Sequence, residues 1–371
     1  MNANQRILLT LVRLAQTTIQ TPCVLSNRDV DLYSSIEWEQ LMNTALAQGV
    51  GGVAFSAIDR LPAKVHPARS ILMRWIGRIM MMEKMYEEHK SKIASLATFY
   101  AKYGIQMLLL KGYGCGLCWP QQGHRPTGDL DVYLFGKHED ADRLIERKLG
   151  IKVHREYHKH STFSYHGVEV ENHAKFIDDV SHKSNIRFEQ TLMSLLCRED
   201  CIESPINNVL LPPPTFNALF LLRHTGEHFA SNEITLRHVL DVGMFFCKYH
   251  SLIDWKIVMT VYRRERMADF FNGIATICVE YLGMGADCFG STDESYSYHH
   301  DTELAKRILA DTFEQKTSLP MSTERINTIT KKLWYGISKS VRWWHNRWKY
   351  RLVYNENLVE SFWWLAINRI K

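Results

Sequence analysis

Two aspartates, Asp129 and Asp131, stand two residues apart in a stretch that is otherwise apolar. In a strand the side chains alternate between faces, so both carboxylates would point the same way, with Cα atoms about 6.5 Å apart. Two like charges on one face repel each other and favour protonation unless a cation compensates them. Hard divalent ions such as Mg²⁺ do so through carboxylate oxygens and keep substrate phosphates in their remaining positions. The pair therefore indicates phosphoryl or nucleotidyl transfer, with a solvated strand end as the plainer alternative.

The elements around this pair predict how it is held. Gln106–Leu110 is a short apolar run that predicts a buried strand, and Lys111-Gly112 interrupts it with a turn whose backbone amides could face a ligand. The basic loop Arg125–Gly128 then leads into a second strand over 129–134. A charged segment over 139–149 predicts a helix. We therefore expect a strand, a glycine turn and a second strand that carries the aspartate pair.

Two segments carry a resemblance to a known superfamily: Leu109-Leu110-Lys111-Gly112 and Arg125-Pro126-Thr127-Gly128-Asp129-Leu130-Asp131-Val132. Together they resemble the DNA polymerase β-like nucleotidyltransferases, which place a glycine turn before an Asp-x-Asp strand. The chain looks most like an uncharacterised bacterial branch in which Lys-Gly replaces the usual Gly-Gly or Gly-Ser. The resemblance covers roughly residues 40 to 245. It implies an α+β fold with a small mixed β-sheet core flanked by N-terminal and C-terminal helical regions.

The superfamily needs a third carboxylate on a neighbouring strand. The segment 152–165 predicts a hairpin, and a strand follows in which Glu169 and Glu171 share a face by the period of two. The branch has Glu-x-His at this strand, which Glu171-Asn172-His173 matches. Glu171 is therefore the expected third ligand and Glu169 the alternative, while either could instead be a solvent-facing strand residue.

The resemblance implies an Mg²⁺-dependent transfer of a nucleoside monophosphate from an NTP to a hydroxyl or similar acceptor, with release of pyrophosphate. Two Mg²⁺ ions, with Mn²⁺ as an alternative, would be held by the catalytic residues Asp129, Asp131 and Glu171. The nucleotide would be bound by Lys111, Gly112, Tyr113, Arg125 and Gly128. Further residues that could face the substrate are Glu169, His173, His224, His228, Arg237 and Asp241. The main alternative is a non-catalytic nucleotide-binding or interaction module on the same fold.

The run His224–His228 spells H-x-x-E-H, the inverted zinc-protease motif. On a helix its two histidines share a face and could hold Zn²⁺, with Glu227 as the base and Glu280 or Glu303 as the third ligand. Against this hypothesis, Gly226 weakens the helix and no second signature identifies the third ligand. A zinc-dependent hydrolase is therefore a distant third interpretation.

The branch also shows paired histidines here, followed by an Arg and an Asp four residues apart, as Arg237 and Asp241 are. Residues at this spacing are neighbours on a helix, so we expect the two to form an ion pair that orients the helix. Four other histidines lie in the hairpin region without ligand spacing, and we expect them at the surface: His154, His158, His160 and His166.

The composition bounds the rest of the prediction. A chain of 371 residues usually divides into two or three units, and we expect a helical region over 1–104, the nucleotidyltransferase core over 105–210 and a helical domain over 211–371. No apolar run approaches the length of a membrane helix. The eight cysteines are scattered and no signal peptide is evident, so a cytoplasmic location is expected. The net charge of +5 suits a polyanionic ligand such as a nucleotide.

The segment 331–351 is basic and rich in tryptophan. Its Trp334, Trp344 and Trp348 approximate one stripe of a helix, which predicts an amphipathic helix packed on the helical domain. Contact with RNA or another polyanion is one alternative, since aromatic side chains stack on bases and cations neutralise phosphates. An amphipathic helix that lies in a membrane interface is the other.

Overall fold

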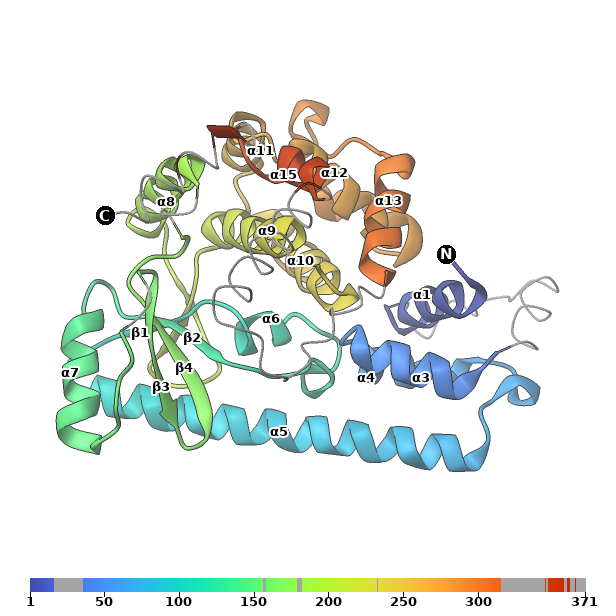
Figure 1. Ribbon diagram of the computed structural model, residues 1–371, viewed down its shortest axis with the longest axis horizontal. Coiled ribbons are helices and arrows are strands. Elements are labelled where there is room, and N and C mark those ends of the chain that lie inside the picture. The colour runs from blue at the N-terminus through green and yellow to red at the C-terminus, as the bar shows by residue number, and fades with distance from the viewer. Residues whose placement is uncertain are drawn as a thin grey trace, which may run out of the picture.

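The fold is α+β, as expected, with a small sheet set among helices (Figure 1). The structure, a computed structural model, describes residues 1–16, 36–155, 158–178, 182–231, 233–314 and 346–356, together with 344, 359, 360 and 364. Among these residues no helix is both long enough and apolar enough to span a lipid bilayer.

The sheet has six strands in the order β3-β4-β2-β1-β6-β5. The strands are β1 (Met107–Leu109), β2 (Leu130–Tyr133), β3 (His160–Tyr165), β4 (Val168–His173), β5 (Ile202–Glu203) and β6 (Val209–Leu211). The β2–β4 and β1–β6 pairs are parallel, and the β1–β2, β3–β4 and β5–β6 pairs are antiparallel. The sheet is therefore mixed, and β2 lies beside β4 near its centre.

Helices precede, interrupt and follow the sheet. Before and between its strands lie α1 (Ala3–Gln16), α3 (Trp38–Ala47), α4 (Gly51–Ser56), α5 (Arg69–Ala101), α6 (Tyr113–Gly116), α7 (His138–Leu149) and α8 (Lys183–Leu196), with short 3₁₀ turns at η1 (Ile58–Arg60), η2 (Ala63–Val65) and η3 (Gln122–His124). After the sheet come α9 (Pro214–Ser231), α10 (Leu236–Tyr249), α11 (Trp255–Arg264), α12 (Ala268–Thr276), α13 (Thr302–Phe313) and α15 (Arg347–Val353). Shorter turns among these are η4 (His250–Leu252), η5 (Ile277–Tyr281), η6 (Ala286–Phe289) and η7 (Glu294–Tyr296).

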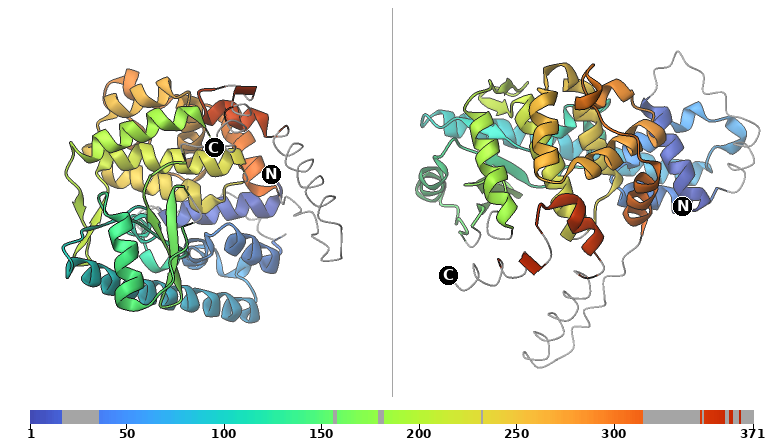
Figure 2. Two further views of the ribbon diagram at one scale, coloured as in Figure 1. Left: turned by 60° about the vertical axis from the view of Figure 1, so that its left-hand side comes forward. Right: turned by 90° about the horizontal axis from the view of Figure 1, so that it is seen from above.

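Two hydrophobic cores cover the two faces of the sheet. Leu109 points into a core formed with the C-terminal half of α5 and with α7, whereas Leu108 and Leu110 point into a larger core that includes α9 and α10. Alternation along the strand thus separates the two cores. In Figure 1, α5 runs along the bottom of the view and α9 and α10 lie above it. The turned view on the left of Figure 2 keeps α5 at the base and the C-terminal helices at the top.

The hairpin of this sheet lies later than the sequence predicted. The strands β3 and β4 form it through the turn His166-Gly167, whereas His154, inside the expected hairpin over 152–165, makes only an isolated bridge to Thr162. Both turn residues have positive φ, 48° and 77°, as a tight two-residue connection requires. The resulting register pairs His160 with His173 and Thr162 with Glu171.

The N-terminal helices share the larger core with the C-terminal helices. Gln48, which follows α3, accepts a hydrogen bond from the Leu236 amide through Oε1 at 2.9 Å and donates from Nε2 to the Thr312 carbonyl at 3.0 Å. The first turn of α10 is therefore anchored by a residue almost two hundred positions earlier in the chain.

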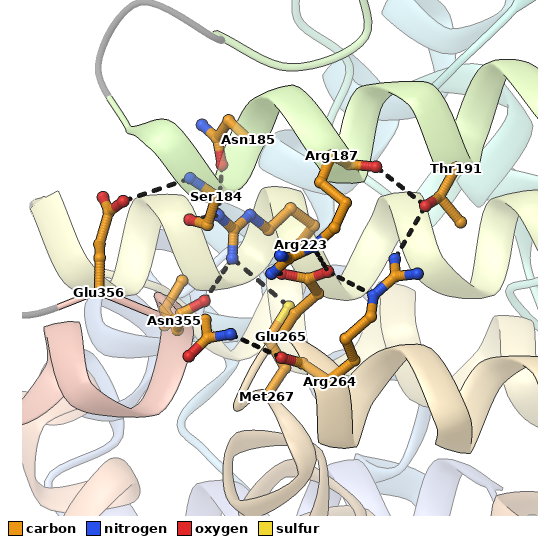
Figure 3. A network of polar contacts seen from close by, with 11 residues as sticks. Ser184, Asn185, Arg187, Thr191, Arg223, Arg264, Glu265, Met267, Asn355 and Glu356 are labelled. Carbon is orange, nitrogen blue, oxygen red and sulfur yellow. Dashed lines mark hydrogen bonds and ion pairs between the residues drawn. The ribbon is translucent and has the colours of Figure 1, made fainter.

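A buried arginine fixes the orientation of α9 (Figure 3). Arg223 is 0% exposed and donates hydrogen bonds to the Asn185 side chain on α8 and to the Val353 carbonyl at the end of α15. Its guanidinium also lies 4.5 Å from the centre of the Tyr354 ring, a cation–π contact that is strong when desolvated.

A second buried charge in the same network joins α8 to the end of α11 (Figure 3). The Glu265 carboxylate accepts hydrogen bonds from Arg187 and from Arg264, both with contacts of 2.7 Å. Because the two arginines stabilise the ionised form more strongly than burial disfavours it, the pKa of Glu265 is lowered. Together, the contacts of Arg223 and Glu265 connect α8 to α9 and to the end of α11.

Two glycines in helices should respond in opposite ways to substitution by alanine. A Cβ at Gly52 would lie 2.5 Å from Cβ of the buried His124, so Gly52→Ala should destabilise the protein by about 1–3 kcal/mol through overpacking. Gly77 has open space around it in the middle of α5, so Gly77→Ala should stabilise by about 0.5–1 kcal/mol. Urea unfolding of the two variants checks both signs, and equal effects would contradict the packing of α4 against η3.

Candidate active site

Three carboxylates meet at the centre of the sheet. Asp129 precedes β2, Asp131 lies in it, and Glu171 stands beside Asp131 on the parallel strand β4. Each offers an oxygen atom, and these atoms lie within 4.8 Å of one another. The structure thus brings together the three residues that the sequence proposed as metal ligands.

Two nitrogen groups compensate the buried Asp131 carboxylate. Lys111 Nζ lies 2.7 Å and His173 Nε2 2.9 Å from the same Oδ1 atom. Burial raises the pKa of Asp131, but Lys111 and His173 outweigh burial and hold the pKa well below its ordinary value. Burial likewise opposes the charge of Lys111, and the carboxylates, Asp131 foremost, still raise its pKa.

The Asp129 carboxyl group has the opposite shift. Burial and the nearby charge of Asp131 raise its pKa above the ordinary value. A divalent cation among these oxygens would relieve both penalties, because an opposite charge favours the ionised form. The oxygen-rich donor set of Asp129, Asp131 and Glu171 suits Mg²⁺.

The glycine turn before α6 lies against the Asp129 backbone. Gly112 has a φ of 58°, and a Cβ there would lie 3.5 Å from the Asp129 carbonyl oxygen. The turn opens α6, where the first backbone N–H groups have no partner within the helix. Tyr113, the first residue of α6, stacks on Tyr86 of α5 with ring centres 5.4 Å apart.

A histidine on α5 contacts the backbone directly before Asp129. The buried His89 lies with Nε2 2.6 Å from the Gly128 carbonyl, directly before Asp129. The sequence analysis missed this residue because His89 occupies a place on the apolar stripe of α5, where a histidine resembles a core residue. The available signal was a histidine on an otherwise apolar helix face, between Tyr86 and Ile93.

A cavity of about 180 Å³ lies between the loops beside β1 and β2 on one side and the helices α9 and α10 on the other. One wall is formed by residues from the part of the chain that contains the sheet, the predicted core over 105–210: Lys111, Gly112, Cys115, Arg125, Gly128, Asp129 and Asp131. The other wall belongs to α9 and α10: Leu221, His224, Thr225, His228, Arg237, His238, Asp241 and Val242. Residues from the core and from the C-terminal helices therefore enclose one space.

Asp241 on α10 joins the two walls. It accepts a bidentate pair from Arg125, with Nε at 2.8 Å and a terminal nitrogen at 2.9 Å, and a third bond from Trp119 Nε1 at 2.9 Å. The expected ion pair between Arg237 and Asp241 is therefore wrong, because the planar fork of Arg125 takes the carboxylate. Arg237 lines the cavity, and its guanidinium forms no hydrogen bond or ion pair with the part of the chain described here.

Three imidazoles belong to the wall formed by α9 and α10, called the upper wall below: His224, His228 and His238. The ring centres of His224 and His228 lie 4.5 Å apart, and those of His228 and His238 5.4 Å apart. Burial and nearby cations lower all three pKa values, that of His228 to about 4 and that of His238 to about 3. These rings are neutral at physiological pH, so each has one donor and one acceptor nitrogen. The acceptor of His238 is already occupied, because Nδ1 accepts a hydrogen bond from the Thr235 amide at 3.0 Å. The sequence analysis did not single out His238.

The zinc-hydrolase interpretation is not supported by this geometry. Glu227, its required base, does not line the cavity and instead accepts a hydrogen bond from Asn185 at 3.1 Å. The suggested third ligands bond elsewhere: Glu280 to Thr302 and Glu303 to Lys306. Within the described ranges, neither His224 nor His228 belongs to a group of three potential metal ligands.

Two predictions for the hairpin turn out differently. Glu169 is exposed and lies outside both clusters of potential ligands found in the described chain. His160, expected at the surface, is half-buried with Nε2 3.7 Å from Glu171, because the hairpin register sets it opposite His173. A hairpin turn at His166-Gly167 was the signal that would have identified it.

Most of the segment 331–351 lies outside the described residues, including Trp334. In the described part, Trp348 packs on Phe229 of α9 with ring centres 5.3 Å apart, and Lys349 is fully buried beside Asp311. Trp348 thus agrees with the expected packing on the helical domain, whereas Trp344, expected on the same stripe, is 62% exposed.

A family model agrees with this geometry. A family model described as "Uncharacterised nucleotidyltransferase" matches residues 34–283, about two thirds of the chain. The chain is also similar to a solved structure, described as the crystal structure of an antigenic nucleotidyltransferase-like protein from Paracoccidioides brasiliensis. That match has 15% identity and a TM-score of 0.31, and covers 43% of this chain and 76% of that chain. No curated protein matches.

Breaking the Arg125–Asp241 pair should be costly. Arg125→Met leaves the Asp241 carboxylate buried without its bidentate partner, so we expect a loss of about 3–5 kcal/mol in the free energy of unfolding. The double variant Arg125→Met/Asp241→Leu should recover part of this loss, because no unpaired charge remains. Urea unfolding of the two single variants and the double variant completes a double-mutant cycle. Additive effects would show that the pair is not coupled.

The upper wall should make stability depend on pH. The folded-state pKa of His228, about 4, lies below the ordinary 6.5, so the unfolded chain binds a proton first as the pH falls. Stability should therefore fall from about pH 6.5 toward pH 4, by up to about 1.4 kcal/mol per pH unit for this group. Urea unfolding across this range should give a shallower loss for His228→Asn. Identical slopes would contradict a neutral, buried His228.

Proposed function

The chain belongs to the family of uncharacterised nucleotidyltransferases, and on that premise we propose that it transfers a nucleoside monophosphate from an NTP to an acceptor hydroxyl. Mg²⁺ is the proposed metal ion and pyrophosphate the second product. The observation that carries the proposal is the group Asp129, Asp131 and Glu171, whose oxygens lie within 4.8 Å of one another at one wall of the cavity.

These three side chains would hold the metal ions. When bound, Mg²⁺ supplies charge stabilisation at the reacting phosphate and an activated acceptor oxygen. The strands β2 and β4 set Asp131 beside Glu171, and His89 holds the Gly128 carbonyl next to Asp129. Rigid backbone elements therefore position the ligands before substrate arrives, which is where electrostatic catalysis gains most.

Residues of the glycine turn and of α10 would bind the triphosphate. The Gly112 turn offers backbone amides, Gly128 lines the same wall, and Lys111 supplies an ammonium group that now lies against Asp131. Arg237 faces the same cavity without a side-chain partner in the described ranges, which supports a phosphate contact. Arg125, which the resemblance implies as a nucleotide ligand, is already bonded to Asp241 and would act by holding its loop in place.

The upper wall would orient the acceptor. His224 and His228 are neutral, so they can donate to or accept from a hydroxyl without adding charge to the cavity. His238 can only donate, because its Nδ1 accepts from the Thr235 amide. We propose an uncharged hydroxyl group as the acceptor for this reason.

Nucleotide binding tests the proposal directly. Calorimetric titration with ATP, CTP, GTP and UTP should show Mg²⁺-dependent binding of at least one NTP to the wild type. Binding should be lost in the Asp129→Asn/Asp131→Asn double variant. Glu171→Gln should weaken metal-dependent binding by at least about tenfold, since even residues behind metal ligands carry losses of about 10–100-fold.

Glu169→Gln is the matched control, because Glu169 lies on the same strand and is exposed outside the carboxylate group. It should bind the NTP as the wild type does. A folded wild-type protein that binds none of the four NTPs would contradict the proposed function and would favour a non-catalytic module on this fold.

A further inference from the structure

A second group of potential ligands adjoins the carboxylates on the same face of the sheet. His160 on β3 stands opposite His173 on β4, and Glu171 lies two residues before His173 on the same strand. Each of the three offers a ligand atom, and these atoms lie within 4.8 Å of one another. Glu171 belongs to both groups.

The spacing of this group suits a metal ion. His173 Nε2 lies 3.3 Å from Glu171 Oε2, and His160 Nε2 lies 3.7 Å from Glu171 Oε1, so each carboxylate oxygen faces one imidazole. With metal–ligand bonds of about 2.1 Å, the ligand atoms of a tetrahedral site lie about 3.4 Å apart. The two observed distances bracket this value, so a bound ion requires only small side-chain movements.

One nitrogen of His173 is already placed as in a metal ligand. Its Nδ1 lies 3.0 Å from the Lys175 carbonyl oxygen, which can only accept, so Nδ1 carries a hydrogen. Its Nε2 lies 2.9 Å from Asp131 Oδ1 in the metal-free protein, so a metal ion at Nε2 would replace that hydrogen bond. A ligating histidine nearly always donates its second nitrogen to a carbonyl or carboxylate in this way. His173 is also 0% exposed, so the ring cannot turn toward solvent.

We propose that His160, Glu171 and His173 bind a first-row transition-metal dication such as Mn²⁺, beside the Mg²⁺ site of Asp129 and Asp131. Imidazole nitrogen suits Mn²⁺, Fe²⁺, Co²⁺ and Zn²⁺, whereas Mg²⁺ prefers oxygen. Two imidazoles on one carboxylate therefore select a different ion from the aspartate pair. Glu171, shared by both sites, links them into one mixed-metal centre.

This site rests on the proposed function only for its role in catalysis, and its existence does not depend on nucleotide. Mn²⁺ alone is therefore the probe, added to the full chain without NTP. Pulsed EPR of bound Mn²⁺ detects the strong coupling of directly bonded ¹⁴N nuclei, which an ion held by oxygen atoms alone does not show. We expect coupling to two imidazole nitrogens in the wild type.

His160, which is less buried than His173, is the residue to replace. His160→Phe keeps a ring of similar size and should leave one nitrogen coupling and weaken Mn²⁺ binding by at least about tenfold. His166→Asn is the matched control: His166 is exposed in the turn of the same hairpin with a φ of 48°, which asparagine tolerates, and both couplings should remain.

Several outcomes would overturn the assignment. These are no binding of Mn²⁺ to folded wild-type protein, bound Mn²⁺ without ¹⁴N coupling, and couplings that His160→Phe leaves unchanged. The wild-type spectrum alone decides the first two, whatever the stability of the variant. Mg²⁺-dependent NTP binding without nitrogen-coupled Mn²⁺ would contradict this site and leave the proposed function standing. Nitrogen-coupled Mn²⁺ in a protein that binds no NTP would support this site and contradict the proposed function.

Discussion

The cavity depends on one buried ion pair. Arg125 belongs to the loop that leads into β2, and Asp241 belongs to α10, so their bidentate contact joins the carboxylate wall to the histidine wall. Trp119, which precedes this loop in the chain, donates a hydrogen bond to the same carboxylate and so attaches a further segment to α10. Because both side chains are buried, neither charge would be stable without its partner. The pair therefore favours one arrangement of the two walls, and loss of either residue should destabilise the fold. Gln48 then anchors the start of α10 from the N-terminal side.

The same reasoning explains how the Asp131 carboxylate persists in the interior. Asp131 is 2% exposed, a position that would drive an unpaired carboxyl group to its neutral form. Lys111 and His173 supply the compensating hydrogen bonds from the turn and from β4. Lys111 is a compact charge on a flexible stem, so one residue can balance Asp131 in the metal-free protein and face a phosphate once metal ions carry that charge.

The sequence predicted features that follow from local periodicity. Alternation along a strand placed Asp129 and Asp131 on one face, and the Glu-x-His pattern of the resembling branch identified Glu171 on the neighbouring strand. The errors arose where distant residues compete. The i,i+4 rule favoured Arg237 as the partner of Asp241, but Arg125, 116 positions away, reaches the carboxylate with a better geometry. His160 was misassigned because the turn was placed too early, and a hairpin register depends on its turn.

The placement of Asp241 also orders the events of synthesis. A ribosome releases the chain from its N-terminus, so β1, β2 and β4 emerge with all three carboxylates well before α10 does. Until Asp241 has left the exit tunnel, Arg125 and Trp119 lack the acceptor that fixes their loop. A nascent chain therefore carries the acidic residues of the site without its upper wall. The cavity can therefore close only after translation has passed Asp241 and this residue has left the tunnel.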